Sequence, residues 1–190
     1  MLVETEGKRI LLDCGPDFRW QMITSRTYHL DAVLISHEHY DHVGGLDDLR
    51  PFCREKGVDI YAEDSVAEAI ETRIPYVFRK HKYPGVPNLE MHRIGTAPFV
   101  AAGLTIVPIR VMHGSLPILG YRIGNMAYLT DLKSLPEEEY AKLEGLDVLI
   151  IAALRRGEHP THESLEQALA NVERIRPKEA YLIHMSHRIG

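Results

Sequence analysis

The sequence is poor in cysteine and has no long apolar run. Its 190 residues include two cysteines, Cys14 and Cys53, which cannot form a disulfide framework and suit a reducing compartment. The longest apolar runs are strand-sized, so we expect no membrane-spanning helix and no membrane partner. The chain does not open on a basic-then-apolar leader. Together these absences predict a cytoplasmic globular protein.

Basic residues are not in excess either. The formal net charge is −5 at pH 7, which argues against a large nucleic-acid footprint, since such a surface favours basic side chains. A short acidic substrate held by metal ions is still compatible with this charge. The length predicts a single domain over residues 1–190, and a homodimer is compatible with the sequence.

Short apolar runs bounded by turn residues alternate with amphipathic stretches, which predicts an α/β or α+β layered domain. The predicted strands are 9–13, 32–36, 58–62, 104–112, 120–124, 126–130, 147–154 and 179–184. The predicted helices are 46–57, 64–74, 136–143 and 164–175. Asp64 is the expected N-cap of the second helix, and Ser164 with Gln167 fits a capping box at the start of the fourth. The basic segment 78–90 predicts a solvated loop, with a lid or a substrate-facing arm as the alternative.

One stretch, "SHEHYDH", crowds ligand-type side chains directly after an apolar run. Residues two apart on an extended chain point the same way, so His37, His39 and Asp41 can converge. His42 points elsewhere unless the chain turns, and the glycines at 44–45 permit such a turn. This geometry suits two metal ions side by side. Imidazole with carboxylate favours zinc, manganese or iron over calcium or magnesium.

Two metal ions need further ligands, and three residues farther along the chain supply them. His113, Asp131 and His184 each lie at the C-terminal end of a predicted strand, where side chains gather on one edge of a sheet. Taken singly, Asp131 could be a helix cap, and either histidine could be a hydrogen-bonded strand-end residue. Together they complete the ligand count. The assignment places three ligands on each ion and one carboxylate between them: His37, His39 and His113; Asp41, His42 and His184; and Asp131 as the bridge.

This ligand series resembles that of the metallo-β-lactamase fold hydrolases, from about Ile10 to the end of the chain. An aspartate at 131 resembles the ribonuclease Z, glyoxalase II and phosphodiesterase branches, because the β-lactamases usually carry cysteine there. The stretches "DHVGGLDDLRPF" and "LLDCGPDFR" are similar to the phosphodiesterase of phosphonate breakdown, which opens cyclic ribose phosphates. The resemblance implies a four-layer α-β-β-α sandwich with a dinuclear site on one edge. It also implies that Asp13 orients the ligand loop.

A histidine outside the ligand series completes the implied chemistry. His162 stands 22 residues before His184, just ahead of the capping-box helix. In the phosphodiesterase and ribonuclease Z branches, a histidine in this loop is the general acid that protonates the leaving oxygen. His162 matches that place better than His159, and imidazole titrates near neutral pH. The alternative is a solvated histidine at a helix start.

His187 follows the last ligand by three residues. In the phosphonate-pathway enzyme, a histidine at this place joins three N-terminal cysteines around a structural zinc ion. Those cysteines, in a C-x-C-x-x-C arrangement, do not occur here. The opening strand and the last helix of the family also have no counterpart in the sequence. We therefore expect the family domain to be incomplete at both ends, with His187 as a candidate ligand for a structural zinc.

The resulting expectation is a metal-dependent phosphodiesterase of small substrates, such as cyclic ribose phosphates or nucleotides. Two divalent ions, zinc or manganese with iron as a further candidate, would generate hydroxide that attacks phosphorus. Asp41 is counted with His162 as a catalytic residue as well as a ligand. The alternatives are a thioester hydrolase like glyoxalase II, then a tRNA-processing nuclease. A redox di-iron domain or a non-catalytic metal-binding module comes last.

Overall fold

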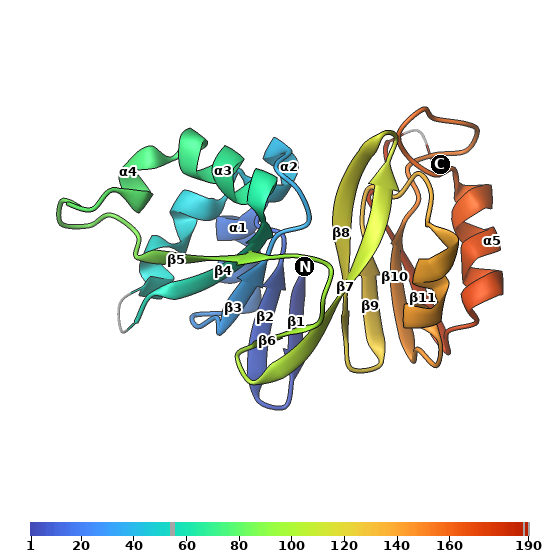
Figure 1. The fold of residues 1–190 in the computed structure, drawn as a ribbon, viewed down its shortest axis with the longest axis horizontal. Coiled ribbons are helices and arrows are strands. Elements are labelled where there is room, and N and C mark those ends of the chain that lie inside the picture. The colour runs from blue at the N-terminus through green and yellow to red at the C-terminus, as the bar shows by residue number, and fades with distance from the viewer. Residues whose placement is uncertain (54–55, 188, 190) are drawn as a thin grey trace. The chain divides into compact units, whose positions relative to one another are not determined.

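The computed structural model describes residues 1–53, 56–187 and 189, and the chain divides into two compact units, Met1–Gly95 and Thr96–Gly190. Each unit contains one β-sheet with helices beside it (Figure 1). Two sheets and several short helices confirm the predicted α/β class. Among the described residues, none of the helices has the length and apolar character needed to cross a membrane.

The first unit holds a five-stranded sheet in the order β1-β2-β3-β4-β5. The first two strands are antiparallel, and the others run parallel to β2. Its strands are β1 (Leu2–Thr5), β2 (Lys8–Leu12), β3 (Ala32–Leu34), β4 (Val58–Glu63) and β5 (Leu89–Ile94). Its helices are α1 (Phe18–Ser25), α2 (Tyr40–Val43), the 3₁₀ helix η1 (Leu46–Cys53), α3 (Asp64–Arg73) and α4 (Pro75–Phe78).

The core of this unit explains why its strands are apolar. Alternate strand residues such as Val33 and Ile60 are fully buried and pack with Phe18, Leu49 and Ile70 from the helices. Because β2 and β3 are parallel, both end at the same edge of the sheet, which is where polar loops can converge.

The second unit holds a six-stranded sheet in the order β11-β10-β9-β8-β7-β6. Strands β6 to β9 form antiparallel pairs, and β9, β10 and β11 are parallel. Its strands are β6 (Phe99–Ala101), β7 (Leu104–His113), β8 (Leu116–Ile123), β9 (Met126–Leu129), β10 (Val148–Ala152) and β11 (Glu179–Ile183). Its helices are the 3₁₀ helix η2 (Glu137–Leu143) and α5 (Leu165–Ile175).

Several local predictions are confirmed, and others are corrected. The capping box at α5 is present: the backbone N–H of Gln167 donates to Oγ of Ser164, and Oε1 of Gln167 accepts from the backbone N–H of Ser164. The N-cap prediction for Asp64 is wrong, because Glu63 caps α3 and Asp64 is its first helical residue. The Asp64 carboxylate, in the first turn of α3, is still stabilised by the positive end of the helix dipole.

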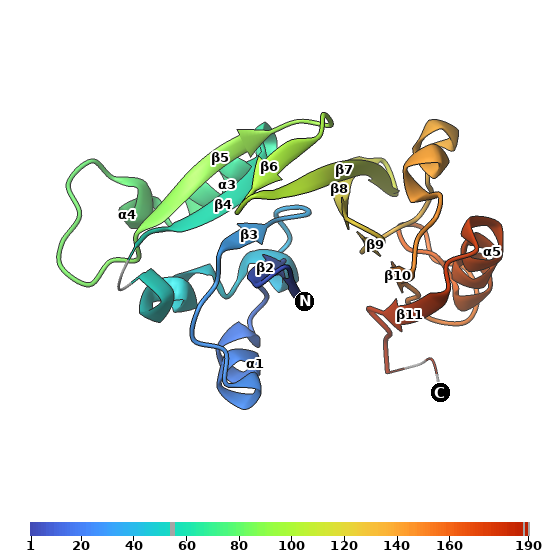
Figure 2. The same ribbon diagram turned by 90° about the horizontal axis from the view of Figure 1, so that it is seen from below.

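The remaining differences lie in element type and extent. The predicted helix 46–57 is instead a 3₁₀ helix that ends at Cys53. Pro51 lies inside it and lacks the N–H that a regular α-helix needs at that position. Residues 54–55 lie outside the described part of the chain. The segment 78–90 is shorter as a loop than predicted, since α4 ends at Phe78 and β5 begins at Leu89. Figure 2 shows this loop extending from between α4 and β5. Strands β1, β5 and β6 and the short helices α1, α2 and α4 were not predicted.

Candidate metal centre

The first ligand set lies on the loop between β3 and α2. His37 and His39 follow the strand, and Asp41 and His42 lie in α2, so the chain does turn where the sequence allowed it. The ring centroids of His37 and His39 are 4.5 Å apart, and those of His37 and His42 are 4.2 Å apart. Three imidazoles are therefore gathered at the end of β3.

A buried aspartate and a serine orient these rings. Oδ1 of Asp13 accepts the backbone N–H of Ser36 at 2.7 Å, and Oδ2 accepts Oγ–H of Ser36 at 2.9 Å and Nδ1–H of His42 at 2.8 Å. Since the serine hydroxyl donates to Asp13, it accepts from Nδ1 of His37, 2.9 Å away. Both imidazoles thus use Nδ1 within the protein, an arrangement in which Nε2 would be the ligand atom for a metal ion.

The ionisation of Asp13 fits this role. Burial alone raises the pKa of its carboxyl, but the hydrogen bond and charge of His42, with the N–H of Ser36, lower it below its ordinary value. Asp13 is therefore a carboxylate at neutral pH, as an acceptor from an imidazole N–H requires.

Two glycines let the segment after β2 pack directly on the ligand loop. The backbone N–H of Cys14 donates to the carbonyl of His42 at 2.7 Å. A Cβ atom on Gly15 would lie 2.3 Å from the carbonyl oxygen of Asp41, and one on Gly45 would lie 2.3 Å from that of Gly15. Any larger residue would push the ligand loop away from Asp13.

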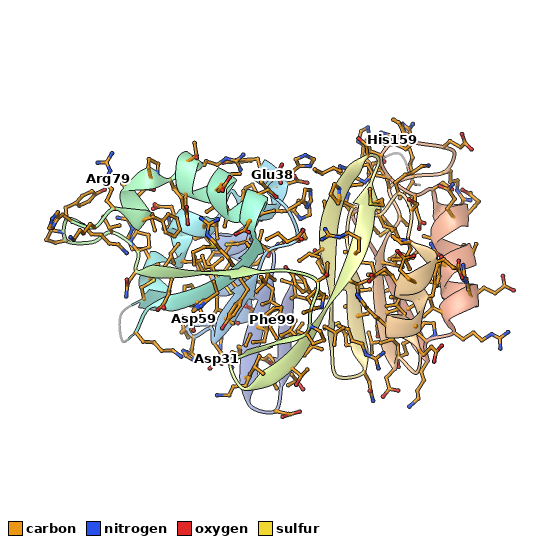
Figure 3. The ribbon with its side chains drawn as sticks, in the orientation of Figure 1. Asp31, Glu38, Asp59, Arg79, Phe99 and His159 are labelled. Carbon is orange, nitrogen blue, oxygen red and sulfur yellow. The ribbon has the colours of Figure 1, made fainter. Side chains whose placement is uncertain are left out.

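Helix α3 also holds this loop. Nη1 of Arg73 donates to the carbonyl of Glu38 at 2.8 Å. The side chain of Glu38 is labelled in Figure 3, on the loop that leads into α2. Arg73 was not predicted, because a contact across 35 positions leaves no local pattern in a sequence.

The second ligand set lies at strand ends of the second unit. His113 ends β7, Asp131 follows β9 and His184 follows β11. Oδ1 of Asp131 lies 3.4 Å from Nε2 of His184 and 3.6 Å from Nδ1 of His162. Oδ2 of Asp131 accepts a hydrogen bond from Thr130 at 2.8 Å. The three predicted residues of this unit are thus arranged around one buried carboxylate.

His162 lies inside this second set rather than at its margin. Its ring centroid is 4.5 Å from that of His113 and 5.3 Å from that of His184, on which it stacks. One ligand-type atom each from His113, Asp131 and His162 lies within 4.8 Å of the other two. The geometry of this unit therefore allows His162 either to bind a metal ion or to exchange a proton with a substrate.

The electrostatics of His162 differ from the expectation of an ordinary imidazole. Burial lowers its pKa to about 4; Asp131 raises it, whereas His113 and His184 lower it further. The imidazole is thus neutral at pH 7 in this arrangement. Nearby negative charge, such as that of a bound phosphodiester, raises an imidazole pKa and favours the protonated form.

Thr161 was missed by sequence reasoning, although it stands beside His162. Its carbonyl accepts Nδ1–H of His113 at 2.8 Å, so that Nε2 would again be the ligand atom for a metal ion. A Cβ atom on Gly114 would lie 3.0 Å from the side chain of Thr161, so the glycine allows this approach. The other predicted histidine, His187, is exposed on the turn after β11, and its role in a structural zinc site stays a prediction.

Three polar positions share an uncommon backbone conformation. Asp13, Asp131 and His184 have φ angles of 57°, 49° and 58°. Non-glycine residues in this left-handed region cost about 1–3 kcal/mol each and cluster at functional sites. Each turns the chain just past a strand end, which aims the side chain along the sheet edge.

The donor chemistry of both sets fits divalent transition metals. Imidazole nitrogen with carboxylate oxygen suits zinc, manganese and iron. Hydrogen bonds to Nδ1 orient three of these rings, as is usual for metal-bound histidine.

Several known proteins are similar to this chain. Residues 8–185 match the beta-lactamase superfamily domain. The chain belongs to this superfamily. The crystal structure of a diphosphatase from the PhnP family is 36% identical, with a TM-score of 0.90 over 98% of this chain and 72% of that one. This places the chain in the PhnP-like and ribonuclease Z-like branch of the superfamily, which the sequence predicted.

Two curated relatives differ in their named activities. An octanoyltransferase of Porphyromonas gingivalis is 49% identical over 98% of this chain, which spans 38% of that relative's length. A ribonuclease Z of Thermosynechococcus vestitus is 27% identical over 60% of this chain and 28% of its own length. The superfamily match is therefore compatible with different named activities among these relatives.

Proposed function

We propose that this chain is a metal-dependent phosphodiesterase of small substrates, such as cyclic ribose phosphates or cyclic nucleotides. The observation that carries the proposal is the position of His162, which adds a proton-transfer group beside Asp131 and His113. The similarity to a PhnP-family diphosphatase supports hydrolysis at a phosphorus–oxygen bond. The net charge of −5 favours a small acidic substrate over a nucleic acid.

The proposal assigns two divalent ions to the ligand sets, zinc or manganese before iron. His37, His39 and His113 are assigned to one ion, Asp41, His42 and His184 to the other, and Asp131 to both. When bound, such ions supply Lewis-acid stabilisation of phosphoryl oxygens and lower the pKa of water.

The protein's own residues supply orientation and proton transfer. Asp13 and Ser36 hold the rings of His37 and His42 with Nδ1 inward, so that neither ring rotates as charge develops on the substrate. Thr161 does the same for His113. In the protonated form, which the negative charge of a bound phosphodiester favours, His162 gives its proton to the departing alkoxide, which is too basic to leave without one.

A second candidate is hydrolysis of an acyl thioester on the same ligands. It is favoured by the 49% identity to a relative named for octanoyl transfer, although this chain spans 38% of that protein. A thiolate leaves without protonation, so this reaction has no need of His162 as an acid. The two candidates therefore differ in what they require of one residue.

A substrate panel tests the proposal. Protein loaded with zinc or manganese is given a 2′,3′-cyclic nucleotide, a nitrophenyl phosphodiester, an octanoyl thioester and a short RNA. We expect about two metal ions per chain by elemental analysis and turnover of both small phosphodiesters. Turnover of the thioester alone would establish the second candidate, and cleavage of RNA alone would establish a nuclease.

A further inference from the structure

Glu163, the residue after His162, is a buried carboxyl that the ligand assignments do not use. Its residue exposure is 4%. Oε1 accepts a hydrogen bond from Nδ2 of Asn171 in α5 at 2.7 Å, whereas Oε2 is buried without a hydrogen-bond partner in the described parts of the chain. Buried carboxyl oxygens without a partner are costly, so their presence calls for an explanation.

The side chain of Asn171 is itself held by Tyr140, which in turn contacts Arg174. Oδ1 of Asn171 accepts Oη–H of Tyr140 in η2 at 2.6 Å, and the guanidinium of Arg174 lies 3.5 Å above the Tyr140 ring. The amide of Asn171 therefore has a defined orientation, with its NH₂ group directed to Glu163. This arrangement ties Glu163 to both helices of the second unit.

The backbone of Glu163 is fixed as well. Its N–H donates to the carbonyl of Leu132 at 2.6 Å, and its carbonyl accepts the N–H of Leu154 at 3.2 Å. Leu132 directly follows Asp131, so the segment that carries His162 is joined to the segment that carries the proposed bridging ligand.

Three consecutive residues thus each contact a different part of this unit. The Thr161 carbonyl holds the ring of His113, His162 faces Asp131, and the Glu163 side chain is held by Asn171. An imidazole between two such anchors has little freedom to move. Misplacement by about 1 Å can cost about a hundredfold in rate, so this restriction matters for proton transfer.

Stability alone does not account for a carboxyl at this position. The pKa of Glu163 is raised to about 7. Burial raises it more than the hydrogen bond from Asn171 and the charge of Lys133 lower it, so ionisation is disfavoured in the folded state. An apolar residue of similar volume avoids the cost of the unpartnered oxygen. What an apolar residue cannot do is accept the hydrogen bond of Asn171.

We propose that Glu163 is a positioning residue for His162, holding the 161–163 segment against α5 through its hydrogen bond with Asn171. This inference rests on the proposed phosphodiesterase function, in which His162 is the general acid. Glu163 itself touches neither the substrate nor the proposed metal ligands and acts through the placement of its neighbour.

The test compares Glu163→Ala with Glu163→Gln on two substrates. Glu163→Ala is expected to lower kcat by about ten- to a hundredfold on a 2′,3′-cyclic nucleotide, whose alkoxide needs a proton, and by less than about threefold on a nitrophenyl diester. Glu163→Gln retains the acceptor for Asn171 and is expected to stay within about threefold of the wild type on both. Asn171→Ala should behave like Glu163→Ala, and Glu173→Gln, at an exposed position of α5, is the matched control.

A double variant and metal analysis separate positioning from general damage. If Glu163 acts through His162, Glu163→Ala adds nothing to His162→Ala on the cyclic nucleotide, although each alone is harmful. Equal losses on both substrates, or additive losses in the double variant, would overturn the proposal, as would a Glu163→Gln protein as poor as Glu163→Ala. If Glu163→Ala does not fold, Asn171→Ala gives the same comparison.

Failure of the proposed function has a different signature. In that case the wild-type protein turns over neither phosphodiester, or His162→Ala shows no dependence on the leaving group. If His162→Ala shows that dependence and Glu163→Ala does not, the phosphodiesterase stands and the positioning role falls.

Discussion

Nδ1 of His42 donates a hydrogen bond to Oδ2 of Asp13 at 2.8 Å, and both side chains are buried. The two residues lie 29 positions apart, at the ends of neighbouring parallel strands β2 and β3. Because the carboxylate accepts the Nδ1–H hydrogen bond, it selects the tautomer of a proposed metal ligand. The pair therefore connects the first sheet to the chemistry of the site.

Replacing Asp13 tests this connection. Asp13→Ala removes the acceptor for His42 and Ser36, so zinc affinity should fall by about ten- to a hundredfold, the usual effect of losing such a partner. Competition with a chromophoric chelator measures the change. Asp17→Ala, an exposed aspartate four residues away, is the control, and unchanged affinity in Asp13→Ala would contradict the orienting role.

Asp131→Ala is expected to abolish metal binding and activity together, because the proposed carboxylate serves both ions. A mere helix cap would cost about 1 kcal/mol of stability and leave catalysis intact. Elemental analysis beside a diesterase assay distinguishes the two. Full activity with metal retained would show that Asp131 has a structural role only.

His162→Ala separates the two candidate reactions. General acid catalysis is typically worth about a hundred- to ten-thousandfold, so that loss is expected on a cyclic ribose phosphate and a far smaller one on a nitrophenyl diester. Metal content should stay unchanged. A loss of metal would instead make His162 a ligand with His113 and Asp131, which the spacing within 4.8 Å allows.

Gly15→Ala should disturb the ligand loop without replacing any ligand side chain. The added Cβ would lie 2.3 Å from the carbonyl oxygen of Asp41, so the backbone must shift. We expect a lower melting temperature and weaker zinc binding. Gly95→Ala is the matched control, since nothing lies within 4 Å of a Cβ there. Equal behaviour of the two variants would contradict the bracing role of Gly15.

The pH dependence of the free energy of unfolding should report the ionisation of the Glu163 carboxyl. Its folded-state pKa, about 7, exceeds the ordinary value of 4.5, so the folded protein binds this proton more tightly than the unfolded chain does. The resulting stabilisation is present below about pH 4.5 and is lost as the pH rises to about 7. Metal-free wild-type protein should therefore lose stability relative to Glu163→Gln across this range in urea titrations. A constant difference would contradict the raised pKa.

The candidate ligands could be proposed from the sequence because they depend on local spacing and on strand ends. In "SHEHYDH" the ligand-type residues alternate and are followed by turn residues within a few positions. The strands before Asp131 and His184 are strongly apolar. Apart from Asp13, which the family resemblance implied, the sequence did not predict the residues that hold the segments of the site in place. Ser36, Arg73 and Asn171 act through contacts that the fold creates between distant segments, and no periodicity marks them.

The errors in element type have a similar cause. Periodicity places apolar residues on one side but does not distinguish a 3₁₀ helix from an α-helix over two turns, as η1 and η2 show. Helix α1 was missed because its exposed face carries Trp20 and Ile23, which removes the amphipathic signal.

The left-handed turns at Asp13, Asp131 and His184 cost backbone strain, yet the proposed chemistry needs the side chains at these positions. Glycine adopts this conformation at no steric cost, so a selection for thermal tolerance alone would tend to favour glycine at these three positions. Such a protein would keep its sheets and lose the side chains that turn at their ends. Directed evolution of this chain toward higher melting temperature should therefore be run with a metal-dependent screen, because heat resistance by itself would reward an inert scaffold.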